Sequence, residues 1–144
     1  MYSTVQILHS YWAYLTLLVL VLAVLNAMVG FFKNKDFSLA KDLRISLFAL
    51  IFCHIQLVIG LILYFVSPRF EAWQTGGIMS DNLLRLLLVE HPLTNIIAIA
   101  LITIGWSKHK KELTSKRKFG KIAVFYGIGL FLILLRIPYD IWFS

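Results

Sequence analysis

The stretch LHSYWAYLTLLVLVLAVLNAMVGFF, residues 8–32, decides the fold of this chain. It contains no Asp, Glu, Lys or Arg. An α-helix rises about 1.5 Å per residue, so a helix that crosses a bilayer core of about 30 Å needs about 20 apolar residues. The stretch exceeds that length and predicts a membrane-spanning helix.

Three more apolar segments of similar length follow, at residues 43–66, 83–106 and 119–143. They are too long, and alternate too little, for the strands of a membrane barrel. We therefore predict an all-α protein, an integral membrane four-helix bundle. Residues 1–144 should form a single transmembrane domain.

The composition supports this class. Of the 144 residues, 60% are hydrophobic and 15% are charged, the mean hydropathy is +0.82 and the formal net charge is +7. About a quarter of the residues of a soluble domain are charged. These values exclude a disordered chain and a nucleic-acid-binding module. Cys53 is the only cysteine, which excludes a disulfide scaffold and a Cys-based zinc site.

Positive charge is concentrated in two of the three loops, between the first and second and between the third and fourth segments. These two loops hold 11 of the 14 Lys and Arg residues, whereas residues 67–82 hold only Arg69. By the positive-inside rule, the two basic loops are cytoplasmic and both termini face the outside. With no signal or transit peptide pattern, we expect a multi-pass protein of the bacterial inner (plasma) membrane with periplasmic termini. The basic loops should meet membrane lipid and no nucleic acid.

The polar residues within the spans share helix faces with small residues. A helix advances about 100° per residue, so positions i, i+3, i+4 and i+7 lie on one face. Three such faces read Tyr2, Gln6, His9, Ala13, Thr16, Leu20, Ala23, Ala27 and Gly30; Ser46, Ala49, Cys53, Gln56, Gly60 and Tyr64; and Leu84, Leu87, His91, Thr94, Asn95, Ala98, Ile102 and Gly105. Small residues let helices or a flat ligand approach closely. We predict that these faces turn inward.

Two histidines facing each other across a bundle can serve as axial ligands of a heme iron. His9 and His91 are the predicted pair, with Gln56 and Gly60 lining the pocket. His54 remains an alternative axial ligand. Counted along ideal helices, His9 differs from His91 by about 12 Å in height and His54 by about 8 Å. The helix face favours His9 as the companion of His91, whereas height along the bundle does not decide between His9 and His54.

The charged residues in the spans allow two interpretations. Arg136 and Arg85 could neutralise heme propionates, or they could form ion pairs or extend toward the headgroups. Glu90 falls at a similar height to Arg136 and could pair with it across two spans, and Asp140 offers Arg136 a local alternative. His109, in a basic loop, is expected to be solvated.

Two prolines fall near these residues. Pro92 should kink the third span or mark a late helix start, which would re-aim His91. Pro138 should act similarly near the end of the fourth span.

With these residues in hand, the chain resembles a small four-span membrane protein of the cytochrome b type. Its first three spans are also similar to one half of heme A synthase, over residues 7–106. The matching runs are LHSYWAYL with His9, QLVIGLILYFVSP with Gln56 and Gly60, and RLLLVEHPL with His91. The resemblance implies heme ligation by His9 and His91. The chain has only four spans and no acidic residue ahead of His9, so heme A synthesis itself is not implied.

The prediction is therefore a membrane protein that binds heme b non-covalently, because no Cys-x-x-Cys-His attachment motif is present. It would transfer electrons or handle heme near the outer face, with a quinol or a respiratory complex as partner and a homodimer as one assembly. One alternative is a heme-free structural or assembly subunit. Another is a small transporter or channel with a polar pathway of Glu90, Arg136 and His54. No enzymatic activity is predicted.

Overall fold

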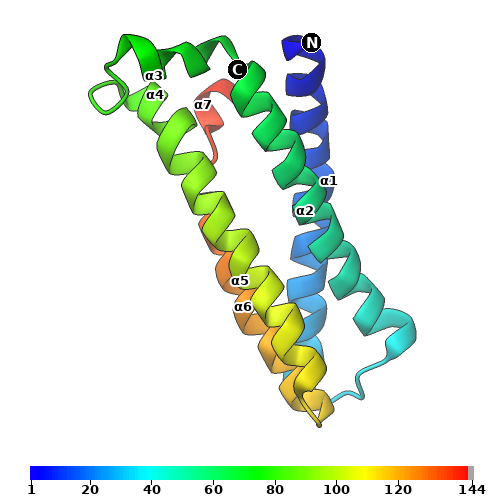
Figure 1. Cartoon of the computed structure of the whole chain (residues 1–144). Helices are drawn as coiled ribbons and strands as arrows, with labels where there is room; N and C mark the ends of the chain where they lie inside the picture. The colour runs from blue at the N-terminus through cyan, green and yellow to red at the C-terminus, as the bar shows by residue number, and fades with distance from the viewer. Residues whose placement is uncertain (143–144) are drawn as a thin grey trace.

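The computed structural model describes residues 1–142, which are mostly helical with no strand in that range. Four long helices form the molecule (Figure 1): α1 (Tyr2–Phe32), α2 (Arg44–Val66), α5 (His91–Lys111) and α6 (Ser115–Leu135). All four, with the turns that extend α2 and α5, are long and apolar enough to cross a membrane. The predicted all-α four-helix bundle is confirmed.

Short helices connect or extend these four. They are η1 (Leu39–Leu43) before α2, η2 (Pro68–Glu71) and α3 (Ala72–Thr75) after it, α4 (Asn82–Arg85) and η3 (Leu86–Glu90) before α5, and α7 (Tyr139–Trp142) after α6. The η1 and η3 turns are π-helical, so they widen the helices that they join.

The long helices pack as a ring in chain order. The pairs in contact are α1 with α2, α2 with α5, α5 with α6, and α6 with α1, and the α2–α5 pair is the loosest. Helices α1 and α5 therefore lie diagonally across the bundle. In Figure 1, α1 and α5 diverge toward the end of the bundle where the N-terminus and α7 lie.

The predicted inward faces are the buried faces. On α1 the buried residues include Thr16, Leu20, Ala23, Ala27 and Gly30. The buried residues of α2 and α5 likewise fall on their predicted faces, with Ile99 and His109 added on α5. Large apolar side chains point outward from all four helices, for example Leu18, Val58, Leu93 and Phe131. An apolar exterior around a core of small residues is what lipid-facing helices require.

The end of the bundle with the basic loops is held by a buried carboxylate. Asp42 is 6% exposed and accepts hydrogen bonds from the Asn26 side chain at 2.8 Å and from the backbone N–H of Ser38 at 2.7 Å. These bonds join α1 to the η1 turn.

His109 lies at the same end and is buried, not solvated as expected. It is 1% exposed and packs against the rings of Phe37 and Trp106. The reason is helix register, because His109 follows the buried Gly105 by four residues and lies on the same inward face.

The last two spans differ from the predicted bounds. Helix α6 begins at Ser115 and ends at Leu135, whereas the prediction ran over residues 119–143. Residue 143 lies outside the described part of the chain. The early end follows from Pro138, which has no N–H and whose ring clashes with a preceding turn. Pro92 acts differently: the helix continues through it, with the π-helical η3 turn directly before His91.

Candidate functional site

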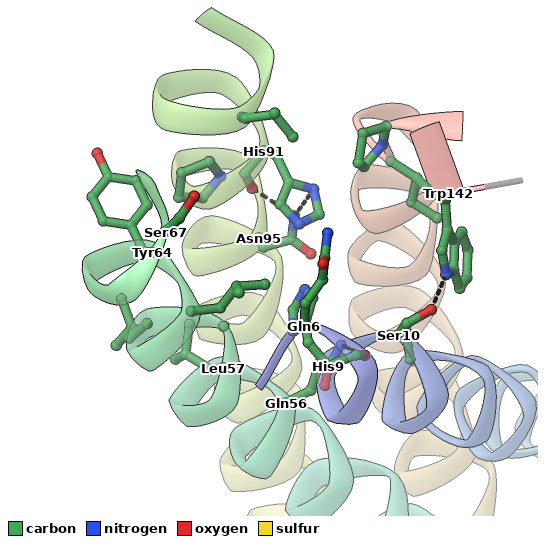
Figure 2. A pocket seen from close by; sticks show the side chains of 18 of the residues that line it. Gln6, His9, Ser10, Gln56, Leu57, Tyr64, Ser67, His91, Asn95 and Trp142 are labelled. Carbon is green, nitrogen blue, oxygen red and sulfur yellow. Dashed lines mark hydrogen bonds between the residues drawn. The ribbon is translucent and has the colours of Figure 1, made fainter. Parts of the chain in front are cut away.

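A cavity of about 420 Å³ opens among α1, α2, α5 and the segment after α6, toward the end of the bundle that carries the termini. Its size is in the range of pockets that hold small molecules and cofactors. Its walls are mainly apolar. The polar residues lining it include His9, Gln56, His91, Asn95 and Arg69. In Figure 2 the side chains of His9, Gln56 and His91 converge on this space from three helices.

The structure brings His9 and His91 together. Their ring centroids are 6.3 Å apart and their ring planes are perpendicular. The two residues come from the diagonal helices α1 and α5, so the space between their rings lies in the interior of the bundle. Most of the height difference estimated from the sequence disappears because α5 continues to Lys111, five residues or about 7.5 Å past the assumed inner end at residue 106. The tilt of α5 accounts for the rest.

The orientation of His91 is fixed by the end of α6. Nδ1 of His91 lies 2.9 Å from the carbonyl oxygen of Arg136. A carbonyl only accepts, so Nδ1 carries the proton and Nε2 keeps its lone pair. Because Pro138 ends α6, the Arg136 carbonyl is available to His91 instead of to a later helical turn. A metal-bound histidine typically donates its other N–H to such an acceptor.

Asn95 adds a second contact to His91. Its side-chain nitrogen donates to the His91 carbonyl at 2.5 Å and lies 3.2 Å from Nδ1. Asn95 follows His91 by one helical turn, so it also limits the rotation of the ring.

His9 is enclosed by α2. Gln56 donates from its side-chain nitrogen to the His9 carbonyl at 2.9 Å. A Cβ built on Gly60 would lie 3.1 Å from Cε1 and 3.6 Å from Nδ1 of the His9 ring. Only a glycine therefore leaves this ring its full space.

Two neighbouring residues of the site each have a buried polar atom without a hydrogen-bond partner within residues 1–142. These atoms are Nδ1 of His9 and Oε1 of Gln56. Buried polar groups in native proteins are nearly always paired. A third such atom, Nε2 of His109, lies at the opposite end of the bundle. Of the three, the two beside the cavity belong to residues that line it.

The two histidines match the requirements of a heme better than those of a bare metal ion. Within residues 1–142 no group of three or more His, Cys, Asp or Glu side chains could hold a metal, and an isolated zinc ion needs three or four protein ligands. Two imidazoles at metal–nitrogen bonds of about 2 Å on opposite sides of one ion have centroids about 6 Å apart. The observed separation fits this arrangement.

His54, the alternative companion of His91, lies elsewhere. Its side chain is exposed, and its ring nitrogens face the Leu50 carbonyl at 2.8 Å and the Thr103 hydroxyl at 3.3 Å. Thr103 follows His91 by 12 residues, or about 18 Å of helix. The structure therefore does not bring His54 and His91 together.

Arg85 and Arg136 do not line the cavity. Both lie beside Glu90, with nitrogen–oxygen distances of 3.1 Å for Arg85 and 3.8 Å for Arg136. Arg85 also donates to the Met79 carbonyl and to the Asn82 side chain. Of the two interpretations made from the sequence, the structure shows ion pairing, and Glu90 rather than Asp140 is the partner of Arg136.

Two residues beside the site were not singled out by sequence. Arg69 lines the cavity, and its signal was its position as the only basic residue in the loop at residues 67–82. Trp142 donates from its indole nitrogen to the Ser10 hydroxyl at 2.6 Å, as Figure 2 shows, and ties α7 to α1 beside His9. Nothing in the local sequence pattern indicates that pairing.

No family model, curated protein or solved structure matches the chain.

Proposed function

We propose that this chain is a membrane protein that binds one heme b non-covalently between His9 and His91. The observation that carries the proposal is the 6.3 Å separation of two imidazole rings from diagonal helices, within a cavity of about 420 Å³. A heme supplies four nitrogen ligands of its own, so two histidines complete its coordination. When bound, it would supply one-electron redox chemistry.

The chain's own residues have distinct tasks in this proposal. His9 and His91 would hold the heme iron, each through a ring nitrogen. The Arg136 carbonyl accepts from Nδ1 of the His91 ring and so leaves the Nε2 lone pair free, and Asn95 donates to the His91 backbone. Gln56 holds the backbone of His9, and Gly60 leaves room for its ring. The apolar walls exclude water from the site, which is one of the means by which proteins tune heme potentials.

The surroundings of the site suggest where such a protein would work. We place it in the bacterial inner (plasma) membrane, with both termini and the cavity mouth on the periplasmic side, because the basic loops lie at the opposite end. The task would be electron transfer or heme handling near the outer face. A quinol or a respiratory complex is the proposed redox partner, and homodimerisation is a further proposal.

Visible spectroscopy tests the proposal directly. The full chain is expressed with ample heme supply, purified in detergent and recorded oxidised and dithionite-reduced. We expect a Soret band and a reduced α band of the b-heme type. His9→Ala and His91→Ala should each abolish the low-spin spectrum, because each removes one axial ligand. His54→Ala, the matched control, should retain it.

Two results would contradict the proposal. A colourless preparation under these conditions excludes heme binding. Loss of the low-spin spectrum in His54→Ala but not in His9→Ala shows that the axial pair has been assigned incorrectly.

A heme-free structural subunit is the second candidate, and one observation favours it. The bond from His91 to the Arg136 carbonyl joins α5 to the end of α6, which is a common use of a histidine between membrane helices. It does not account for His9, whose Nδ1 is buried without a partner within residues 1–142. The polar pathway of a transporter is not favoured, because His54 lies about 18 Å along the bundle from His91.

A further inference from the structure

One cation lines the cavity, and it is not one of the two arginines first considered for heme propionates. Arg69 belongs to the η2 turn that follows α2, at the mouth of the cavity. Its side chain is half-buried. The inference that follows rests on the proposed heme site and concerns the orientation of the ligand in it.

Arg69 has no acidic partner within residues 1–142, in contrast to Arg85 and Arg136, which share Glu90. Its guanidinium donates to the Tyr2 hydroxyl at 3.4 Å, and no other side-chain acceptor contacts it in that range. A guanidinium has five N–H donors, so most of its hydrogen-bonding capacity is available. A half-buried guanidinium that has unused donors and no acidic partner is a favourable place for an anion to bind.

The position of Arg69 is set by its turn. Ser67 accepts a hydrogen bond from the Arg69 backbone N–H at 3.2 Å, and Pro68 restricts the backbone between them. Tyr2, which contacts the guanidinium, precedes His9 by seven residues on α1, or about 10 Å along the helix. The carboxylate arms of a porphyrin whose iron lies between the two rings extend over a comparable distance.

From this geometry we infer that Arg69 is the carboxylate-binding residue of the cavity. A heme between His9 and His91 is oriented with its propionates toward the η2 turn and the bundle end that carries the termini. Arginine binds carboxylates with two parallel hydrogen bonds, and this geometry fixes orientation as well as affinity.

The test compares two ligands on the apo form of the full chain in a neutral detergent. The ligands are heme b and its dimethyl ester, in which both propionates are esterified and uncharged. We expect Arg69→Gln to weaken binding of heme b by about tenfold to a hundredfold and to leave binding of the ester unchanged. Wild-type protein should prefer heme b over the ester by a similar factor, and Arg69→Lys should recover part of that preference.

Arg85→Gln is the matched control, because it removes an arginine that contacts Glu90 outside the cavity. It should leave the preference for heme b intact. Equal loss of both ligands in Arg69→Gln, or no loss of heme b, overturns the assignment of Arg69 while leaving the heme site in place. Failure of the wild type to bind either ligand overturns the heme site itself.

Anionic phospholipid shares the chemistry that Arg69 recognises, so one arm of the experiment adds phosphatidylglycerol to the detergent. If Arg69 serves a propionate, the lipid leaves the preference for heme b over its ester unchanged. If Arg69 serves a lipid phosphate, the lipid removes that preference, and the inference is wrong.

Discussion

At the residue scale, Gly60 is the position where the addition of a single methyl group would disturb the site. Its missing side chain leaves space for the Cε1 edge of the His9 ring, which a Cβ would approach to 3.1 Å. Such a contact is tighter than ordinary van der Waals contact, so the ring must shift. Gly60 lies on the predicted small-residue face of α2, and the structure gives this placement a specific neighbour.

We predict that Gly60→Ala lowers heme affinity about tenfold, in the range seen when a residue supporting a metal ligand is changed. Gly127→Ala is the matched control. A Cβ at Gly127 has its nearest neighbour, a Val24 methyl, 4.0 Å away, so this change should leave affinity unaltered. Heme titration monitored at the Soret band measures both. Equal losses in the two variants would show that Gly60 does not act through His9.

At the element scale, the carbonyls next to the two prolines have tyrosine partners. A proline has no N–H, so in an α-helix the carbonyl four residues earlier loses its donor. Pro138 leaves the Leu134 carbonyl in this way, and that carbonyl accepts from the Tyr139 hydroxyl at 2.6 Å. Before Pro92 the η3 turn is π-helical, with its bonds running five residues back. Within this turn the Leu88 carbonyl accepts from the Tyr64 hydroxyl at 2.8 Å.

The Tyr64 hydroxyl therefore links α2 to the η3 turn that precedes His91. Tyr64→Phe should lower the free energy of unfolding by about 0.5–1 kcal/mol, because the Leu88 carbonyl loses this donor. Unfolding in a denaturing detergent measures the loss.

Tyr64→Phe also removes the bond from the Trp73 indole nitrogen to the Tyr64 hydroxyl, 2.9 Å. Trp73→Phe is the matched control, because it removes that bond and keeps the Tyr64 hydroxyl. A loss in Tyr64→Phe no larger than the loss in Trp73→Phe would contradict a stabilising bond to the Leu88 carbonyl.

At the scale of the whole molecule, the basic loops lie at one end of the bundle and the cavity lies at the other. The bond between Trp142 and Ser10 places the end of α7 beside the start of α1, so both termini belong to the cavity end. The proposed orientation puts that end outside the cell.

Labelling of single cysteines tests this orientation. In a Cys53→Ala background, Ser80→Cys lies in the loop at the cavity end and Leu113→Cys lies in a basic loop, where Leu113 is 95% exposed. A maleimide that cannot cross membranes should label Ser80→Cys in intact spheroplasts. It should label Leu113→Cys only after the membrane is permeabilised. The reverse pattern would invert the proposed topology.

The sequence predicted the bundle and its inward faces because both depend on patterns within single helices. Apolar length determined the spans, and the small-residue faces that include His9 and His91 depend only on helical periodicity. The choice of His9 over His54 as the neighbour of His91 also agrees with the placement of the rings.

Features that depend on contacts between helices were not predictable in this way. The end of α6 at Leu135 depends on Pro138. The length of an apolar segment does not reveal the effect of a single proline. Glu90 forms ion pairs with both Arg85 and Arg136. The sequence allowed several charge pairs and did not decide among them. Arg69 is the only basic residue within residues 67–82, but it lines the cavity because of the position of the η2 turn, which depends on contacts between helices.

The bond between His91 and the Arg136 carbonyl has a consequence for biosynthesis. A membrane chain enters the bilayer from its N-terminus, so His9 and then His91 are in place before residue 136 is made. Until α6 has been inserted, the His91 ring lacks the acceptor that orients it, and one wall of the cavity is missing. Loading of the proposed heme would therefore come late, after the ribosome has completed the fourth span.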